Sequence, residues 1–202
     1  GLGELTGIDL PQETPGIVPP PAWKRRAVGE KWYPGDTVNA SIGQGFVATT
    51  PLQMARVTAV VANGGRLVTP HVVRKIMTVK GEPVPLQRAE AKNVGIEPRY
   101  LALVRQGMRS AVVGRRGTAG SLAGLPVAVA AKTGSAETRP GEKPHSWVVT
   151  FAPYDSPRLA MAVIVEHGGH GVDAAVPIAK ALYAYLWKAE NSPDGAPAAP
   201  GD

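Results

Sequence analysis

The residues best suited to chemistry form one short segment, Lys132-Thr133-Gly134-Ser135-Ala136, which follows an apolar run. An ammonium group and a hydroxyl on a strand can bind the carboxylate at a peptide C-terminus through charge-assisted hydrogen bonds. A glycine beside them lets a substrate backbone approach closely. The amide N–H that follows can donate to an oxyanion. The segment therefore carries the groups with which an acyl-transfer site would hold its substrate.

A Lys-Thr-Gly tripeptide alone is weak evidence, because it also occurs where a strand simply ends in a polar turn. The full serine acyl-transferase signature adds Ser-x-x-Lys and Ser-x-Asn, both before Lys-Thr-Gly. None of the seven serines has Lys three residues later or Asn two residues later. Only the third element of the signature is therefore present in this sequence.

Further motifs in a fixed order accompany this segment along residues 1–188. They are Gly7-Ile8-Asp9-Leu10-Pro11, Trp32-Tyr33-Pro34-Gly35-Asp36, Gly43-Gln44-Gly45, Thr50-Pro51-Leu52-Gln53-Met54-Ala55, Ala62-Asn63-Gly64-Gly65, Gly117-Thr118-Ala119, His145-Ser146-Trp147, Phe151-Ala152-Pro153 and Glu166-His167-Gly168-Gly169-His170-Gly171. As a set they resemble the class B penicillin-binding proteins, above all the elongation-type branch called penicillin-binding protein 2.

The resemblance implies an α+β fold, with an antiparallel sheet flanked by helices, as in the C-terminal part of the penicillin-binding transpeptidase (serine β-lactamase-like) fold. It also implies a peptidoglycan D,D-transpeptidase that works through a serine acyl-enzyme. Lys132 and Thr133 would bind the substrate carboxylate, and Lys132 would support proton transfer. Ser135 would give its N–H to the oxyanion hole and its hydroxyl to the carboxylate. Gly134 and Ala136 complete this expected substrate-binding strand.

In the family both missing serine motifs precede the segment that resembles Gly1–Pro11. We therefore expect the nucleophile in an upstream half, and we expect this chain alone to be inactive. The resemblance implies D-Ala-D-Ala stem peptides and β-lactams as ligands, and no cofactor. Expected partners are the N-terminal half of the same protein and membrane proteins of the elongation machinery. The implied location is the periplasmic face of the bacterial inner membrane, through an upstream anchor.

Two other classes of function remain open on the sequence. One is a non-catalytic chain that binds muropeptides or partner proteins. The other is a nucleic-acid module, suggested by the net charge of +6, although the basic clusters Lys24-Arg25-Arg26 and Arg115-Arg116 lack interleaved aromatic residues. We expect no nucleic-acid partner.

Metal binding has little support in the sequence. The chain has no cysteine, and His145, His167 and His170 do not make a four-ligand zinc set. A Gly-rich turn after a strand explains the last two histidines, so we expect no metal. Among the acids, Asp9, Glu13 and Asp36 have no regular spacing, which favours turn capping over cation binding.

The proline-rich first part of the chain and the segment that follows it predict different structures. Residues 1–48 are expected to be irregular beside the cleft, because their prolines forbid long helices. Residues 50–64 predict a helix with Thr50 as N-cap, Pro51 at its first position and Gln53 in a capping box. His71–Val79 predicts a strand that turns at Lys80-Gly81.

The rest of the chain predicts regular elements in quick succession. A helix is expected over 98–113, followed by the strands Val127–Lys132, Ser146–Phe151 and Leu159–Glu166 in an antiparallel meander. A last helix over Ala174–Lys188 should pack on the sheet through Ile178, Leu182, Tyr185 and Leu186.

We expect residues 1–190 to be one C-terminal part of a transpeptidase domain, with helices and a hairpin over 50–113, the meander and last helix over 127–188, and a disordered tail over 191–202. Two further strands, expected from the upstream half, would flank Leu159–Glu166. Without them this apolar strand has an open edge, so the isolated chain is expected to be unstable.

Overall fold

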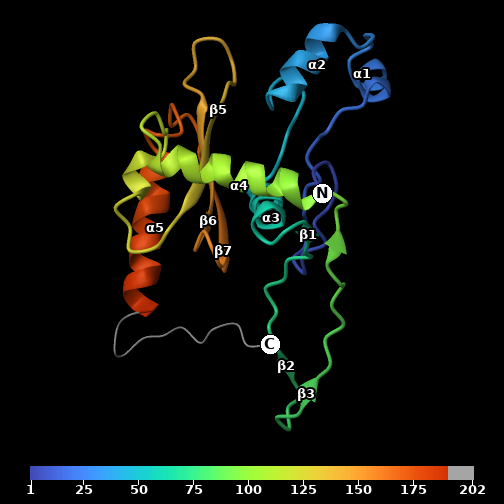
Figure 1. The fold of residues 1–202 in the computed structure, drawn as a ribbon. Coiled ribbons are helices and arrows are strands. Elements are labelled where there is room, and N and C mark those ends of the chain that lie inside the picture. The colour runs from blue at the N-terminus through green and yellow to red at the C-terminus, as the bar shows by residue number, and fades with distance from the viewer. Residues whose placement is uncertain (191–202) are drawn as a thin grey trace. The chain divides into compact units, whose positions relative to one another are not determined.

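The computed structural model describes residues 1–190, and the tail expected from residue 191 lies outside them. The chain forms two compact units, Gly1–Ile96 and the part from Glu97 onward. The first unit holds α1 (Pro21–Ala27), α2 (Pro34–Ser41), α3 (Pro51–Ala62), β1 (Arg66–Leu67), β2 (Ile76–Met77), β3 (Pro83–Val84) and β4 (Lys92–Asn93). The second holds α4 (Pro98–Val113), a 3₁₀ turn η1 (Gly120–Leu122), β5 (Ala130–Ala136), β6 (His145–Ala152), β7 (Leu159–Val165) and α5 (Ala175–Glu190) (Figure 1).

Helix α3 begins as the sequence predicts, with a reciprocal capping box. Gln53 N–H donates to Thr50 Oγ1 at 3.1 Å, and Thr50 N–H donates to Gln53 Oε1 at 3.0 Å. The fully buried Gln53 side chain does more than cap, because its Nε2 donates to the carbonyl oxygens of Glu4 and Pro15 at 2.8 and 2.6 Å. One side chain therefore attaches the irregular N-terminal segment to α3.

The expectation of an irregular stretch over residues 1–48 needs correction, because it contains two short helices. Helix α1 has seven residues and α2 has eight, and each has its proline at the first helical position, Pro21 and Pro34. A proline at that position lacks only an N–H that would have no helical partner anyway. The same residues that exclude long helices therefore start short ones.

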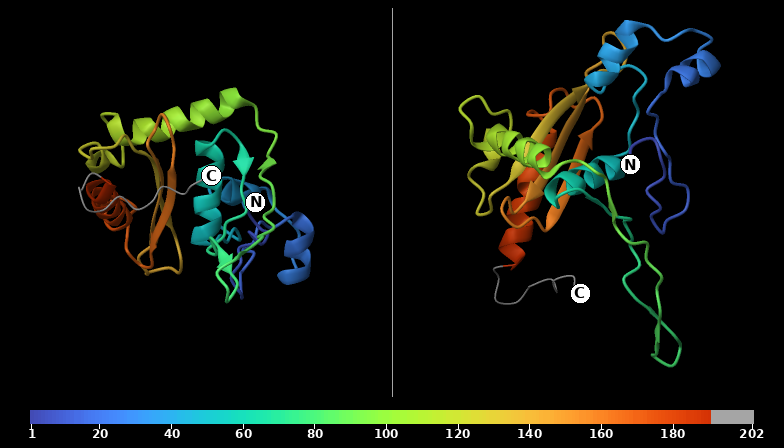
Figure 2. Two further views of the ribbon diagram at one scale, coloured as in Figure 1. Left: turned by 90° about the horizontal axis from the view of Figure 1, so that it is seen from below. Right: turned by 45° about the vertical axis from the view of Figure 1, so that its right-hand side comes forward.

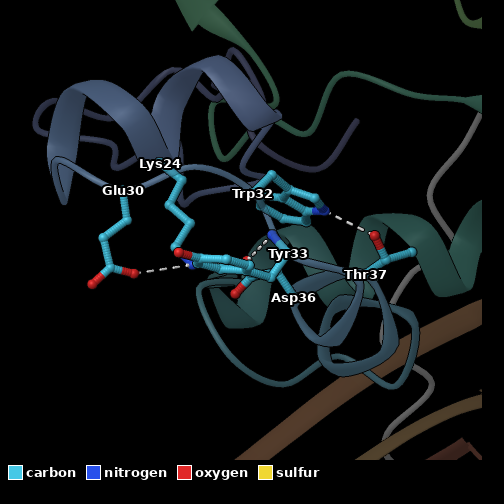
Figure 3. A network of polar contacts seen from close by, with 6 residues as sticks. All are labelled: Lys24, Glu30, Trp32, Tyr33, Asp36 and Thr37. Carbon is cyan, nitrogen blue, oxygen red and sulfur yellow. Dashed lines mark hydrogen bonds and ion pairs between the residues drawn. The ribbon is translucent and has the colours of Figure 1, made fainter.

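Lys24 connects these two helices through a nearly buried ion pair (Figure 3). Its side chain is 5% exposed, and its Nζ lies 2.7 Å from Asp36 Oδ2 and 3.5 Å from Glu30 Oε2. Asp36 Oδ2 also accepts the Tyr33 N–H at 2.7 Å, and the Lys24 ammonium lies 4.8 Å from the centre of the Tyr33 ring. Because α2 buries no side chain of its own, this polar contact is a main link between α1 and α2.

The strand predicted over His71–Val79 is mostly wrong, since only Ile76 and Met77 pair, with β3. The N–H groups of Val72 and Val73 donate to the Asp9 carboxylate at 2.7 and 3.0 Å instead. These bonds, first the one from Val72, lower the pKa of Asp9. β-branched residues favour strands mainly where they pack on a half-buried sheet, and no larger sheet forms here within the first unit.

Glu13 has a similar role, because it accepts the N–H groups of Thr6 and Gly7 at 2.7 and 3.1 Å. Asp36 accepts the Tyr33 N–H at the start of α2, so turn capping is confirmed for Glu13 and Asp36. Asp9 instead binds backbone N–H groups 63 and 64 residues away.

The predicted meander is confirmed in the second unit, where β5, β6 and β7 pair in order and antiparallel. Strand β5 differs from its predicted bounds, since it begins at Ala130 and continues through the Lys-Thr-Gly segment to Ala136. The reason is the partner strand: β6 pairs with β5 as far as Ala136 opposite His145. The Lys-Thr-Gly segment therefore lies within a hydrogen-bonded ladder rather than beyond its end.

Helix α5 covers one face of this sheet (Figure 2) but not through the residues that the sequence suggests. Its buried residues are Ala175, Val176, Ala179 and Tyr183. Of the predicted face, Ile178 is 41%, Leu182 42% and Tyr185 71% exposed. The two alanines allow close approach to the sheet, and Tyr183 Oη forms a 2.9 Å hydrogen bond with Thr150 Oγ1. Burial raises the pKa of Tyr183 to about 12.

Replacement of Asp36 by Asn should lower the thermal stability of the protein in a pH-dependent way. The Lys24 ammonium, followed by the Tyr33 N–H, lowers the pKa of Asp36 below its ordinary value near 3.8. Its contribution to stability is therefore complete above about pH 4 and is lost as pH falls through the lowered pKa. The hydrogen bond to Asp36 raises the pKa of Lys24 above 10.5, so the pair is lost again at higher pH.

Thermal denaturation measured at pH 7 and pH 3 tests this expectation. The gap in melting temperature between wild type and Asp36→Asn should be large at pH 7 and should shrink toward pH 3. Asp155→Asn, at an exposed position between β6 and β7, serves as the control. An equal gap at both pH values would show that the ionised pair does not stabilise these helices.

Candidate active site

The pleat of β5 divides the side chains of the predicted site between the two faces of the sheet. Side chains of successive strand residues point to opposite faces. Ala131 belongs to the core beneath α5, so Thr133 and Ser135 share the α5 face. Lys132 and Gly134 therefore lie on the other face. All five residues that the sequence singles out lie on this one strand.

The Thr133 hydroxyl meets a second hydroxyl from another part of the chain. Its Oγ1 lies 2.7 Å from Thr118 Oγ1, in the segment between α4 and η1. The neighbouring Ala119 is fully buried and its N–H donates to Ala111 at 2.9 Å, which attaches this segment to the end of α4. Thr118 is absent from the predicted site residues, although it is the centre of the Gly117-Thr118-Ala119 motif. That motif was the signal that could have identified it.

The Ser135 hydroxyl meets the turn between β7 and α5. Its Oγ lies 3.3 Å from His170 Nδ1. The turn itself is held by Ser146, whose fully buried hydroxyl donates to the His170 carbonyl oxygen at 2.8 Å and accepts the Ala175 N–H at 3.0 Å. Since Ser146 pairs with Ser135 across the ladder, β6 carries the support for this part of the site.

Gly171, in the turn between β7 and α5, packs directly against β5. A Cβ at this position would lie 2.5 Å from the carbonyl oxygen of Trp147, 2.9 Å from that of Gly134 and 3.0 Å from Thr133 Cβ. Two of these neighbours are backbone atoms of the paired strands and have little freedom to move. A glycine is therefore required for the turn to pack directly against Thr133 and Gly134.

Lys132 is exposed, and its ammonium donates to the carbonyl oxygen of Thr133. A hydrogen bond within the strand holds the charge close to the Lys-Thr-Gly backbone. The strand is also an edge of the described sheet, whose order is β5-β6-β7. An edge strand offers free N–H and C=O groups with which an extended peptide can pair. Charge, hydroxyls and a strand edge together suit the C-terminal carboxylate of a peptide.

All three histidines considered as metal ligands have a ring nitrogen in contact with the protein, and the contact of His170 is the one with Ser135. His145 Nδ1 accepts the His167 N–H at 3.0 Å, and His167 Nδ1 lies 3.2 Å from the Lys143 carbonyl oxygen. Residues 1–190 contain no group of three or more His, Asp or Glu arranged to hold a metal ion. His167 at φ 53° and Gly169 at φ 84° form the turn that the sequence suggests.

The model of the penicillin-binding protein transpeptidase domain matches residues 1–184. The chain belongs to this family. The peptidoglycan D,D-transpeptidase MrdA of Acinetobacter baumannii is 35% identical in an alignment 197 residues long, which covers 92% of this chain and 29% of that protein. The α+β fold expected from the sequence is confirmed by the solved structures of the family.

Two of these structures are of penicillin-binding protein 2. The Pseudomonas aeruginosa protein, in complex with WCK 5153, has a TM-score of 0.80 and 35% identity over 92% of this chain and 40% of its own. The Helicobacter pylori protein, in complex with MreC, has a TM-score of 0.78 and 33% identity over 93% of this chain and 34% of its own. The chain thus spans about a third of the length of the relatives that it matches.

Replacement of Gly171 by Ala should destabilise the second unit by about 1–3 kcal/mol, the usual range for an added methyl group that its surroundings do not accommodate. Gly124→Ala is the matched control, because nothing lies within 4 Å of a Cβ there. Denaturant unfolding of both variants measures the difference. Equal stabilities would show that the turn can move away from β5 without loss.

Proposed function

We propose that this chain is the C-terminal part of the transpeptidase domain of a peptidoglycan D,D-transpeptidase, with Lys132–Ala136 as its substrate-binding strand. The observation that carries this proposal is the position of the Lys-Thr-Gly segment within an edge strand, in a chain whose family and fold are those of penicillin-binding transpeptidases. The proposed substrate is a stem peptide that ends in D-Ala-D-Ala.

In this proposal the residues of β5 hold the acyl donor. Lys132 and Thr133 bind the terminal carboxylate, and Ser135 adds its hydroxyl. The Ser135 N–H donates to the oxygen of the scissile carbonyl, which becomes negative as a serine attacks. Attack breaks the bond to the terminal D-alanine, which leaves with a proton on its amine. The amine of a neighbouring peptide then displaces the serine and forms the cross-link. Lys132 supports the proton transfers, and Gly134 and Ala136 leave room for the peptide backbone.

The serine nucleophile is proposed to come from a segment outside this sequence. None of the seven serines here has the Ser-x-x-Lys pattern, and the chain spans only a third of its relatives. The same outside segment is proposed to supply strands beside β7, an edge strand of the described sheet whose seven residues are all partly exposed. The two parts would then form one domain, and neither would be active alone.

Location and partners follow as parts of the same proposal. No helix within residues 1–190 is long and apolar enough to cross a membrane. We propose that an anchor elsewhere in the protein holds the domain on the periplasmic face of the inner membrane. The structure of the Helicobacter pylori protein with MreC supports a partner among the membrane proteins that elongate the cell wall. The proposed small-molecule ligands are β-lactams, which mimic D-Ala-D-Ala.

Benzylpenicillin tests the division of the site between two segments. The isolated chain should show no covalent adduct by intact mass spectrometry, because it lacks the acylated serine. The longer protein, with this chain and its upstream Ser-x-x-Lys segment, should show one adduct per molecule.

Either opposite result has a clear meaning. A stoichiometric adduct on the isolated chain would make one of its own seven serines the nucleophile. A longer protein that binds muropeptides without acylation would favour the non-catalytic alternative.

Replacement of Lys132 by Met in the longer protein should slow acylation by benzylpenicillin by roughly 10²–10⁴-fold, the range for loss of a positioned proton-transfer group. Lys143→Met, an exposed lysine of the β5–β6 connection, is the matched control and should acylate at the wild-type rate. Stopped-flow acylation rates, with circular dichroism to verify folding, measure both. A Lys132→Met rate within a few-fold of wild type would remove Lys132 from the chemistry.

A further inference from the structure

We propose that His170 is a positioning residue that controls the direction in which the Ser135 hydroxyl donates its hydrogen. This inference rests on the proposed function, because it takes β5 to bind a substrate carboxylate. His170 would not touch the reacting atoms. It would act through Ser135, whose Oγ lies 3.3 Å from its Nδ1.

A serine hydroxyl has a single hydrogen to donate. A carboxylate only accepts hydrogen bonds, so Ser135 must donate its O–H to bind one. If His170 Nδ1 carries no hydrogen, it accepts the Ser135 O–H and competes with the substrate. If Nδ1 carries a hydrogen, it donates to Ser135 Oγ, and the hydroxyl hydrogen is not used on the imidazole. Carboxylate binding is therefore favoured when His170 Nδ1 carries the hydrogen and donates it to Ser135 Oγ.

The backbone of His170 is fixed from several directions, so its ring is held near β5. Its carbonyl oxygen accepts from Ser146 Oγ at 2.8 Å and from the Asp173 N–H at 2.9 Å. Its own N–H donates to Asp173 Oδ2 at 3.2 Å. The next residue, Gly171, packs against Thr133 and Gly134 too closely for a side chain. A turn so firmly attached to β5 keeps the imidazole within reach of Ser135.

The role differs from that of Thr118 beside Thr133. Between two hydroxyls either one can be the donor, so Thr118 can accept a hydrogen bond from Thr133 or donate one to it. An imidazole nitrogen has one fixed role in each protonation and tautomer state. His170 is therefore the neighbour that can impose a direction on a hydroxyl of this strand.

The test compares acylation of the longer protein by benzylpenicillin, whose carboxylate stands in for that of the peptide. The proposal takes His170 Nδ1 as a donor to Ser135 Oγ, the arrangement that leaves the Ser135 hydrogen for a carboxylate. His170→Ala removes this donor, and His170→Asn replaces Nδ1 with an amide nitrogen that donates from a similar position. We expect His170→Ala to weaken initial binding by roughly tenfold, the effect of one lost hydrogen bond, with a smaller change in the acylation step. His170→Asn should stay within about threefold of wild type on the same scale. His71→Ala, an exposed histidine of the first unit, is the control.

The Ser135→Ala background separates a role through Ser135 from a purely structural one. There His170→Ala should cause no further loss of binding. The proposal is overturned if His170→Ala binds like wild type, if His170→Asn is as poor as His170→Ala, or if the loss persists without the Ser135 hydroxyl. A wild-type protein that is not acylated at all would instead overturn the proposed function, and this inference with it.

Discussion

The second unit depends on the pairing of β5 with β6 over its full length, as far as Ala136 opposite His145. This ladder determines which side chains of Lys132–Ala136 face α5 and which lie on the opposite face of the sheet. It also places Ser146 opposite Ser135, where its buried hydroxyl joins the turn of His170 to the start of α5. A loss of register here would move Lys132 and Thr133 to the wrong faces, since a one-residue slip exchanges the faces of a strand.

The first unit is held in a different way, by a few buried polar side chains rather than by a broad apolar core. Gln53 binds two backbone carbonyls of the N-terminal segment, and Lys24 joins two short helices through Asp36. Buried polar groups that lose their partners are expensive. Such contacts therefore specify the path of an irregular chain, where apolar patterns are too short to do so.

Sequence reasoning succeeded where the signal was local. The capping box at Thr50 and Gln53, the helix from Pro98 and the order of the three sheet strands all follow from neighbouring residues. The strand predicted over His71–Val79 is mostly absent, because its β-branched residues have no larger sheet to pack on. The predicted contact face of α5 is wrong, because the helix has a second apolar face that could also pack on the sheet. The smaller stripe around Ala175 and Ala179 packs on the sheet, because it permits the closer approach and brings Tyr183 to Thr150.

The chemical groups of the candidate site can be read from the sequence: an ammonium group, two hydroxyls and a glycine in one five-residue segment, within a recognisable series of motifs. The residues that surround these groups are known only from the fold. Thr118 is fifteen residues from Thr133 and His170 is thirty-five from Ser135, so no local spacing relates them. His170 reaches Ser135 because a tightly packed glycine turn lies against β5, and Thr118 reaches Thr133 because its segment is attached to the end of α4.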